Sequence, residues 1–98
     1  MKKSLAIVVL TWNDHVNTKK CIKSIYPQLN TKTKLILVDN NSENKVYNQT
    51  LNWIKKNYNK KFLKLNNTKN IKNIFSNKKN IFILKNNKNL GCGYGHNT

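Results

Sequence analysis

The chain has very few acidic residues and no arginine. Three Asp and Glu side chains stand against 19 basic ones, all lysine, and the formal net charge is +16 over 98 residues. Such a charge normally favours nucleic acid as a partner, because clustered cations displace counterions from phosphate. Asparagine is equally abundant, however, and Lys, Asn and Ile share A/T-rich codons, so a biased base composition accounts for the profile. Because the lysines are also scattered rather than aligned on one face, we predict no nucleic acid partner.

Cysteines and long apolar runs are scarce as well. Cys21 and Cys92 lie far apart and fit no disulfide or zinc pattern, so neither kind of scaffold is predicted. No apolar run approaches the roughly 20 residues that a membrane-spanning helix needs. The apolar run at 5–10 is too short for a secretory signal, and no small-residue cleavage site follows it. We therefore expect a cytoplasmic protein, with peripheral attachment to the inner face of the plasma membrane as a further option because lysines attract anionic lipid.

Three apolar runs that the sequence does contain predict β-strands. The runs are LAIVVL (5–10), KLILVD (34–39) and NIFILKN (80–86). The first is rich in β-branched residues and continuous rather than alternating, which is typical of a strand buried on both faces of a parallel sheet, and the second repeats this signature.

Two segments between these runs have the spacing of helices. Residues 14–29 carry apolar side chains at helical intervals, and Asn13 or Asp14 is a candidate cap for the helix. The segment after Ser42 repeats the pattern, with Ser42 as its candidate N-cap. Lys and Asn interrupt every apolar cluster in residues 59–80, where we expect a loop or a loosely held extra helix.

The order strand, helix, strand, helix, strand predicts an α/β fold. We expect a three-layer βαβαβ unit with a Rossmann-like parallel sheet, because parallel strands need such crossovers. A chain of 98 residues has room for one hydrophobic core, so residues 1–98 are interpreted as part of one domain.

Polar segments follow each of the three predicted strands. They are TWN (11–13), DNNS (39–42) and NLGCGYGHN (89–97). Ligands of open parallel sheets bind beyond the carboxyl ends of the strands, near the point where strand order reverses, so we expect these segments to form one site. Asp39 can accept hydrogen bonds there from a ribose hydroxyl or a base N–H. The alternatives are that Asp39 closes a turn or caps a helix, and that Trp12 is an aromatic residue of the core or of its rim.

The glycine segment differs from the dinucleotide-binding fingerprint. Its spacing in GCGYG is GxGxG rather than GxGxxG, which disfavours a Rossmann dehydrogenase. Closely spaced glycines nevertheless permit positive φ angles and let a ligand approach the backbone, although a flexible turn before a further helix is an equal alternative.

In combination, these segments resemble the opening of a family 2 glycosyltransferase with the GT-A fold. The residues that carry the resemblance are IVVLTWN, CIKSI, LILVDNNS and NNKNLGCGYGHN, in that order. They span nearly the whole chain apart from the variable insert at about 59–80. Among subgroups, the chain is similar to the rhamnosyltransferase-like enzymes that build surface polysaccharides.

The resemblance implies that residues 1–98 are the N-terminal nucleotide-sugar-binding part of a GT-A domain. The implied donor is a UDP- or dTDP-linked sugar, and Asp39 is implied to bond its base. The implied binding residues are Thr11, Trp12, Asn13, Asp39 and Asn41, with Asn89, Gly91 and Asn97 from the segment that closes over the donor.

The activity implied by the resemblance is transfer of a hexosyl or deoxyhexosyl group to a saccharide or lipid-linked acceptor. The acceptor hydroxyl loses its proton and attacks the anomeric carbon, while Mg or Mn stabilises the departing diphosphate. The family's metal-binding DxD motif and its catalytic base have no match here. We therefore expect a truncated, donor-binding portion of an enzyme without transfer activity of its own, in which an apolar strand is left at an open edge of the sheet.

Two alternatives belong to other functional classes. The chain is then either a non-catalytic nucleotide-binding or interaction module, or a polyanion binder that depends on its lysines. Binding of uridine and thymidine diphosphates separates the nucleotide-binding readings from the polyanion binder, for which DNA affinity is expected to fall steeply with salt.

Overall fold

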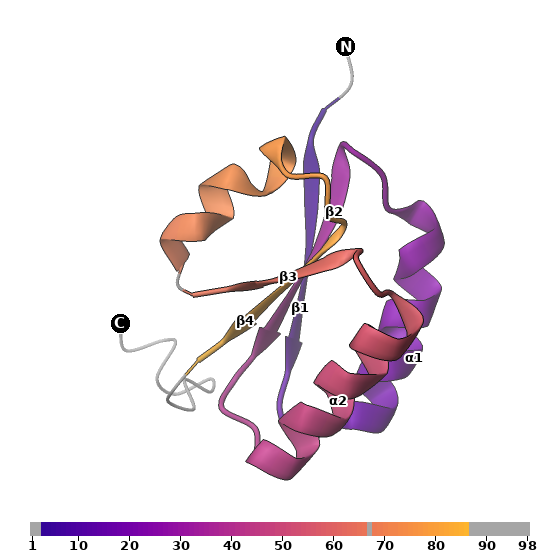
Figure 1. Ribbon diagram of the computed structural model, residues 1–98, viewed down its shortest axis with the longest axis vertical. Helices are drawn as coiled ribbons and strands as arrows, with labels where there is room; N and C mark the ends of the chain where they lie inside the picture. The colour runs from indigo at the N-terminus through magenta and orange to yellow at the C-terminus, as the bar shows by residue number, and fades with distance from the viewer. Residues whose placement is uncertain (1–2, 67, 87–98) are drawn as a thin grey trace.

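The computed structural model describes residues 3–66 and 68–86 of the chain (Figure 1). Its elements are, in order, β1 (Leu5–Thr11), α1 (His15–Ile25), the 3₁₀ helix η1 (Tyr26–Gln28), β2 (Thr33–Asp39), α2 (Asn44–Asn57), β3 (Phe62–Leu65), the 3₁₀ helix η2 (Thr68–Ser76) and β4 (Ile81–Lys85). The predicted α/β class is confirmed, and the three predicted strands correspond to β1, β2 and β4.

The four strands in the described part of the chain are all parallel, in the order β1-β2-β4-β3. The strand β3 was not predicted, because residues 59–80 were expected to form a loop or a loose helix. Its four residues hold only a brief apolar cluster around Lys64, which is too short to show a strand pattern. β3 pairs with β4 and contributes to both cores. Phe62 packs in the core on one face of the sheet, and Leu65 packs in the core on the other face.

The helices and η2 lie on opposite faces of the sheet. Figure 1 shows α1 and α2 together on one side and η2 on the other. The connections from β1 and from β2 run in the same direction along the sheet, so right-handed crossovers place both helices on the same face. The connection from β3 to β4 runs back in the opposite direction, which brings η2 to the second face.

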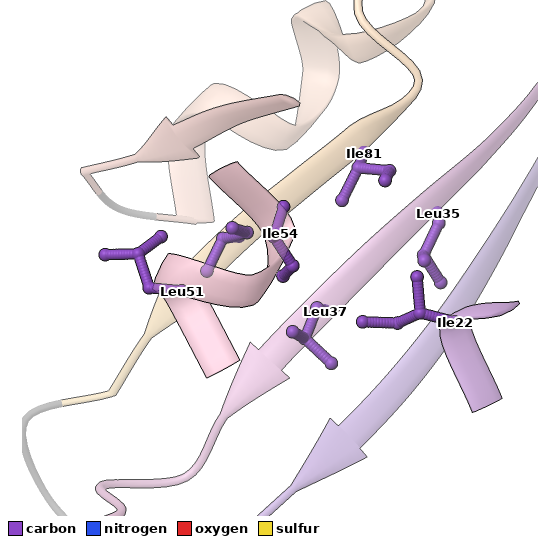
Figure 2. Packing of buried hydrophobic residues seen from close by; sticks show 7 residues of the cluster. Ile22, Leu35, Leu37, Leu51, Ile54 and Ile81 are labelled. Carbon is purple, nitrogen blue, oxygen red and sulfur yellow. The ribbon is translucent and has the colours of Figure 1, made fainter. Parts of the chain in front are cut away.

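The larger core lies between the sheet and the two helices. Ile22 of α1 and Ile54 of α2 are fully buried against the apolar side chains of β2 and β4. Figure 2 shows these side chains directed toward one another from both helices and both strands. Their contact explains why the runs of β2 and β4 are apolar without interruption, since each strand also has a second face to bury.

The smaller core lies beneath η2 and contains a buried lysine. Ile74 of η2 packs against Ile36 of β2 and Phe82 of β4. The fully buried Lys34 donates hydrogen bonds from Nζ to the backbone oxygens of Asn77 at 3.0 Å and Lys79 at 2.6 Å. Burial lowers the pKa of Lys34. The lysine thereby ties the segment after η2 to the centre of the sheet.

The prediction that the first apolar run is buried on both faces is wrong. β1 is an edge strand, and its Val8 and Leu10 are 62% and 65% exposed. These side chains lie on the face that carries η2, whose cluster reaches Ala6 of β1 but leaves Val8 and Leu10 uncovered. The run in β2 is buried as predicted, and the run in β4 is buried as well.

The ends of the helices differ in part from the predictions. Asp14 caps α1 as predicted, and its carboxylate accepts a hydrogen bond from the backbone N–H of Asn17 at 3.0 Å. The helix ends at Ile25 rather than at residue 29, because Pro27 lies in a separate 3₁₀ turn. Ser42 does not cap α2: the N-cap is Glu43, which makes no side-chain cap bond. The hydroxyl of Ser42 is used in the turn described below.

Candidate functional site

The carboxyl ends of β1, β2 and β4 meet at one edge of the sheet, as predicted. Thr11 pairs with Asp39, and Asp39 pairs with Lys85 in the strand register. Neighbouring residues in register point to the same face of a parallel sheet. The three side chains therefore form a row beside the N-terminal ends of α1 and α2, which we call the carboxyl edge.

Asp39 is almost completely buried in the turn between β2 and α2. It is 4% exposed, and its carboxylate accepts hydrogen bonds from Ser42 N at 2.9 Å and from Ser42 Oγ at 2.7 Å. The turn-closing role considered for Asp39 is therefore present in the structure. A carboxylate has about four lone-pair sites, so these two bonds leave acceptor capacity on Asp39.

Asn13 joins the turn after β1 to the turn after β2. Its backbone N–H donates to Ser42 Oγ at 2.8 Å, and its side-chain Oδ1 accepts from the backbone N–H of Glu43 at 2.7 Å. Asn13 and Asn41 have φ angles of 48° and 62°, in the left-handed region that Asn tolerates better than most residues. We call the bonded set Asn13, Asp39, Ser42 and Glu43 the turn network.

Thr11 and Trp12 belong to a different part of the edge. The hydroxyl of Thr11 lies 2.5 Å from that of Thr18, which ties β1 to α1, and the backbone oxygen of Thr11 accepts from Asn40 N at 2.8 Å. Trp12 is 54% exposed, so it is not a core residue. Both residues line an open groove of about 280 Å³ between the end of β1 and α1, together with Asp14 and Asn17.

The groove has one acidic group, the carboxylate of Asp14. Hydrogen bonds from the backbone and side chain of Asn17 hold the pKa of Asp14 below its ordinary value. Asn13, Asp39 and Asn41 do not line this groove. Among the described residues, the predicted site residues are thus divided: Thr11 and Trp12 line the groove, whereas Asn13, Asp39 and Asn41 lie in the two turns outside it.

Two further residues at the carboxyl edge, Lys85 and Tyr47, were not predicted. The ammonium group of Lys85 lies 4.7 Å from the ring centroid of Tyr47 and 3.5 Å from the backbone oxygen of Ser42. Burial, and then the charge of Asp39, raises the pKa of Tyr47. The position of Lys85 at the end of the third apolar run could have identified it as a residue of this edge. Its place beside Asp39 follows only from the pairing of β4 with β2.

The reversal of strand order lies away from these residues. β1 and β2 both lead into helices on the same face, and the first described connection to the other face leaves from β3. β4 separates β3 from β2. The predicted coincidence of the site with the reversal is therefore not seen for Thr11 and Asp39 in the described part of the chain.

The remaining predicted site residues, Asn89, Gly91 and Asn97, lie outside the described residues. Within residues 3–66 and 68–86, no three His, Cys, Asp or Glu side chains are grouped so that they could hold a metal ion. As grouped there, these residues do not fit the divalent cation that the resemblance implies. None of the helices in the same ranges combines the length and apolarity of a membrane crossing.

Comparison with known proteins yields no relative. No protein-family model matches the chain, and no curated protein or solved structure matches it.

Proposed function

We propose that the chain is the donor-binding part of a glycosyltransferase and binds a UDP- or dTDP-linked sugar at the carboxyl edge. The observation that carries the proposal is the buried carboxylate of Asp39 in the row Thr11, Asp39 and Lys85. Uracil and thymine each present one imide N–H, and a carboxylate is a strong acceptor for such a donor.

The surroundings of Asp39 support selective binding of a base. A buried acceptor discriminates well, because a ligand without the matching donor does not satisfy it. The turn network holds the carboxylate in place through Ser42, so little side-chain freedom is lost when a ligand binds. The two oxygens retain lone pairs for a further donor.

Charge and aromatic surface at the same edge also support a nucleotide. Lys85 is a cation beside Asp39, and a cation in this position attracts the phosphates of a nucleoside diphosphate. Trp12 presents a largely exposed indole, the kind of side chain on which bases stack. Because Trp12 lies in the groove and Asp39 in the turn network, the ligand must span from one to the other.

The proposed reaction follows from the donor. The glycosyl group passes to a saccharide or lipid-linked acceptor in the synthesis of surface polysaccharide. In this proposal the described residues bind and orient the donor, and none of them is assigned as the catalytic base.

Calorimetric titration with uridine and thymidine diphosphates, with and without manganese, tests the proposal. We expect saturable binding of at least one nucleotide, and an Asp39→Asn variant that binds it at least about tenfold more weakly. Asparagine keeps an oxygen for Ser42 N and an amide for Ser42 Oγ, so the turn is preserved while the carboxylate is removed.

The matched control is Glu43→Gln, which makes the same change of charge at the same edge of the sheet. Glu43 is bonded to Asn13 through its backbone N–H, and its exposed side chain makes no cap bond, so this variant should fold and bind nucleotide normally. Equal losses in both variants would show that charge alone matters, and undiminished binding by Asp39→Asn would refute the role of Asp39. Absence of nucleotide binding together with salt-sensitive DNA binding would favour the polyanion alternative.

A further inference from the structure

The outer edge of β1 carries backbone groups that no described strand pairs. Leu5 N–H donates to Lys32 O, and Thr11 O accepts from Asn40 N, so the odd-numbered residues of β1 point their backbone groups toward β2. Alternate residues of a parallel strand point to opposite sides. Ala6, Val8 and Leu10 therefore direct their N–H and C=O groups outward, away from the sheet.

The same strand lacks the features that usually prevent an edge from pairing. From Leu5 to Thr11 it has no charged residue, no proline and no glycine. Val8 and Leu10 expose their side chains on the face that η2 leaves uncovered. An uncharged edge strand of seven residues with exposed apolar side chains is a template for another strand.

We propose that β1 is a self-association edge, at which two copies of the chain pair their β1 strands in antiparallel orientation about a twofold axis at Val8. This register uses all three outward-facing residues: Val8 opposes its own copy, and Ala6 opposes Leu10 of the other copy. The two sheets become one sheet of eight strands. The inference is independent of the proposed function.

A second copy fits this edge in both side chains and charge. Residues opposed in an antiparallel pair point to the same face, so Val8 and Leu10 of the two copies form one apolar stripe. Beyond the paired strands, Lys3 of one copy approaches the turn that follows β1 in the second copy and leads to Asp14, one of only three acidic residues in the chain. An isologous contact of this kind closes after two copies and needs no further partner.

Two physical factors make the association weak. A single strand pair buries less than the roughly 1,200 Å² of total surface that stable complexes bury. Each copy also carries a formal charge of +16, so the copies repel each other. We expect a dissociation constant on the order of tens of micromolar that improves severalfold between roughly 0.1 and 1 M salt, as the Debye length falls from about 10 to about 3 Å.

Sedimentation velocity of the full chain across a concentration series measures this equilibrium. Val8→Lys places two like charges across the twofold axis and should weaken dimerisation at least about tenfold. The matched control is Leu63→Lys in β3, the opposite edge strand, where Leu63 is 39% exposed. This control adds the same charge and should change the dissociation constant by less than about twofold, because repulsion between distant charges is screened.

Disulfide trapping tests the register even if Val8→Lys fails to fold. Opposed residues of a hydrogen-bonded antiparallel pair have Cα atoms about 5.5 Å apart, within the roughly 4.4 to 6.8 Å that a disulfide spans. Val8→Cys should therefore give a covalent dimer on mild oxidation. Leu10→Cys should not, because four residues of offset separate the two thiols by about 13 Å. The unchanged chain, oxidised in parallel, measures crosslinks through Cys21 and Cys92.

Several outcomes would overturn the proposal. One is a chain that stays monomeric at several hundred micromolar protein and high salt. A second is equal weakening by Val8→Lys and Leu63→Lys, and a third is trapping through Leu10→Cys rather than Val8→Cys. Nucleotide binding by a strictly monomeric chain would refute the dimer and leave the proposed function intact.

Discussion

The sheet ends in two edge strands of opposite character. β1 has seven residues and no charge, and it leaves Val8 and Leu10 exposed. β3 has four residues, with Lys64 in its middle. Short length and lysine are two of the means by which proteins keep edge strands from pairing. The comparison shows that the sequence of β3 protects its edge, while that of β1 does not.

The two edges also differ in how they are covered. Leu65 of β3 is buried in the cluster beneath η2, whereas Leu10 of β1 is exposed on the same face of the sheet. Lys34 helps to hold η2 over β3, because its Nζ donates hydrogen bonds to the backbone between η2 and β4. The edge strands β1 and β3 therefore differ in packing as well as in charge.

The largest expected effect comes from shortening a leucine at each edge. Leu65→Ala should lower the free energy of unfolding by about 2 to 5 kcal/mol, because it leaves a cavity in a packed cluster. Leu10→Ala should lower it by less than about 1 kcal/mol, because the side chain is already in water. Denaturant unfolding of the two variants at dilute protein concentration measures both values. Equal losses would show that β1 is covered.

The second prediction tests the direction of the backbone groups of β1. Val9→Pro removes an N–H that faces β2, whereas Val8→Pro removes one that faces outward. Both prolines restrict the strand, but only the first leaves an acceptor in the sheet without its donor. Val9→Pro should be more destabilising by about 1 to 3 kcal/mol, as measured by denaturant unfolding. A larger loss for Val8→Pro would mean that the strand is turned the other way.

A smaller effect on the free energy of unfolding is expected from Lys34, which helps to hold η2 over β3. Burial lowers the pKa of Lys34 below its usual value of 10.5, so the unfolded chain binds more protons than the folded chain in the alkaline range below that value. The free energy of unfolding should rise with pH in this range. Lys34→Met should lack this rise. Unfolding titrations of both proteins between neutral and alkaline pH give the difference, and parallel curves would exclude a contribution from Lys34.

The smallest expected effect lies at the turn that follows β1. The pKa of Asp14 is lowered mainly by the backbone N–H of Asn17, so its stabilising effect is present above the unfolded pKa and is lost as pH falls through the folded one. Asp14→Ala should lower the thermal midpoint slightly at neutral pH, because a helix cap is lost. Asp14→Asn should keep the thermal midpoint of the unchanged chain at neutral pH. Its thermal midpoint should fall less than that of the unchanged chain as the pH is lowered. If acid lowers the thermal midpoint of Asp14→Asn as much as that of the unchanged chain, groups other than Asp14 cause the decrease.

Much of the fold was predictable because the relevant patterns are local. The runs in β2 and β4 are continuous and apolar, and the helices bury Ile22 and Ile54 as their spacing predicts. β3 escaped prediction because four residues around Lys64 show no period. An apolar strand at an open edge was expected, but its identity as β1 was not predicted, because the composition of a strand does not show its position in the sheet.

The candidate site was predicted less completely than the fold. Thr11 and Asp39 lie at the predicted edge of the sheet, since parallel strands end on the same side. The division between the groove and the turn network was not foreseen, because it depends on which hydrogen bonds Ser42 and Asn13 make. Lys85 was missed because its proximity to Asp39 follows from strand order.

Apart from β3, the sequence by itself determined the element types, the apolar runs and the polar turns, because these arise from interactions between residues near one another in the chain. Tertiary structure decided which strands became neighbours, and thereby which apolar strand lies at an open edge and which cation lies beside Asp39. The physical reason is that hydrogen bonding between strands uses the backbone, which is the same in every strand. Their order is settled by how connections and side chains pack across the whole sheet.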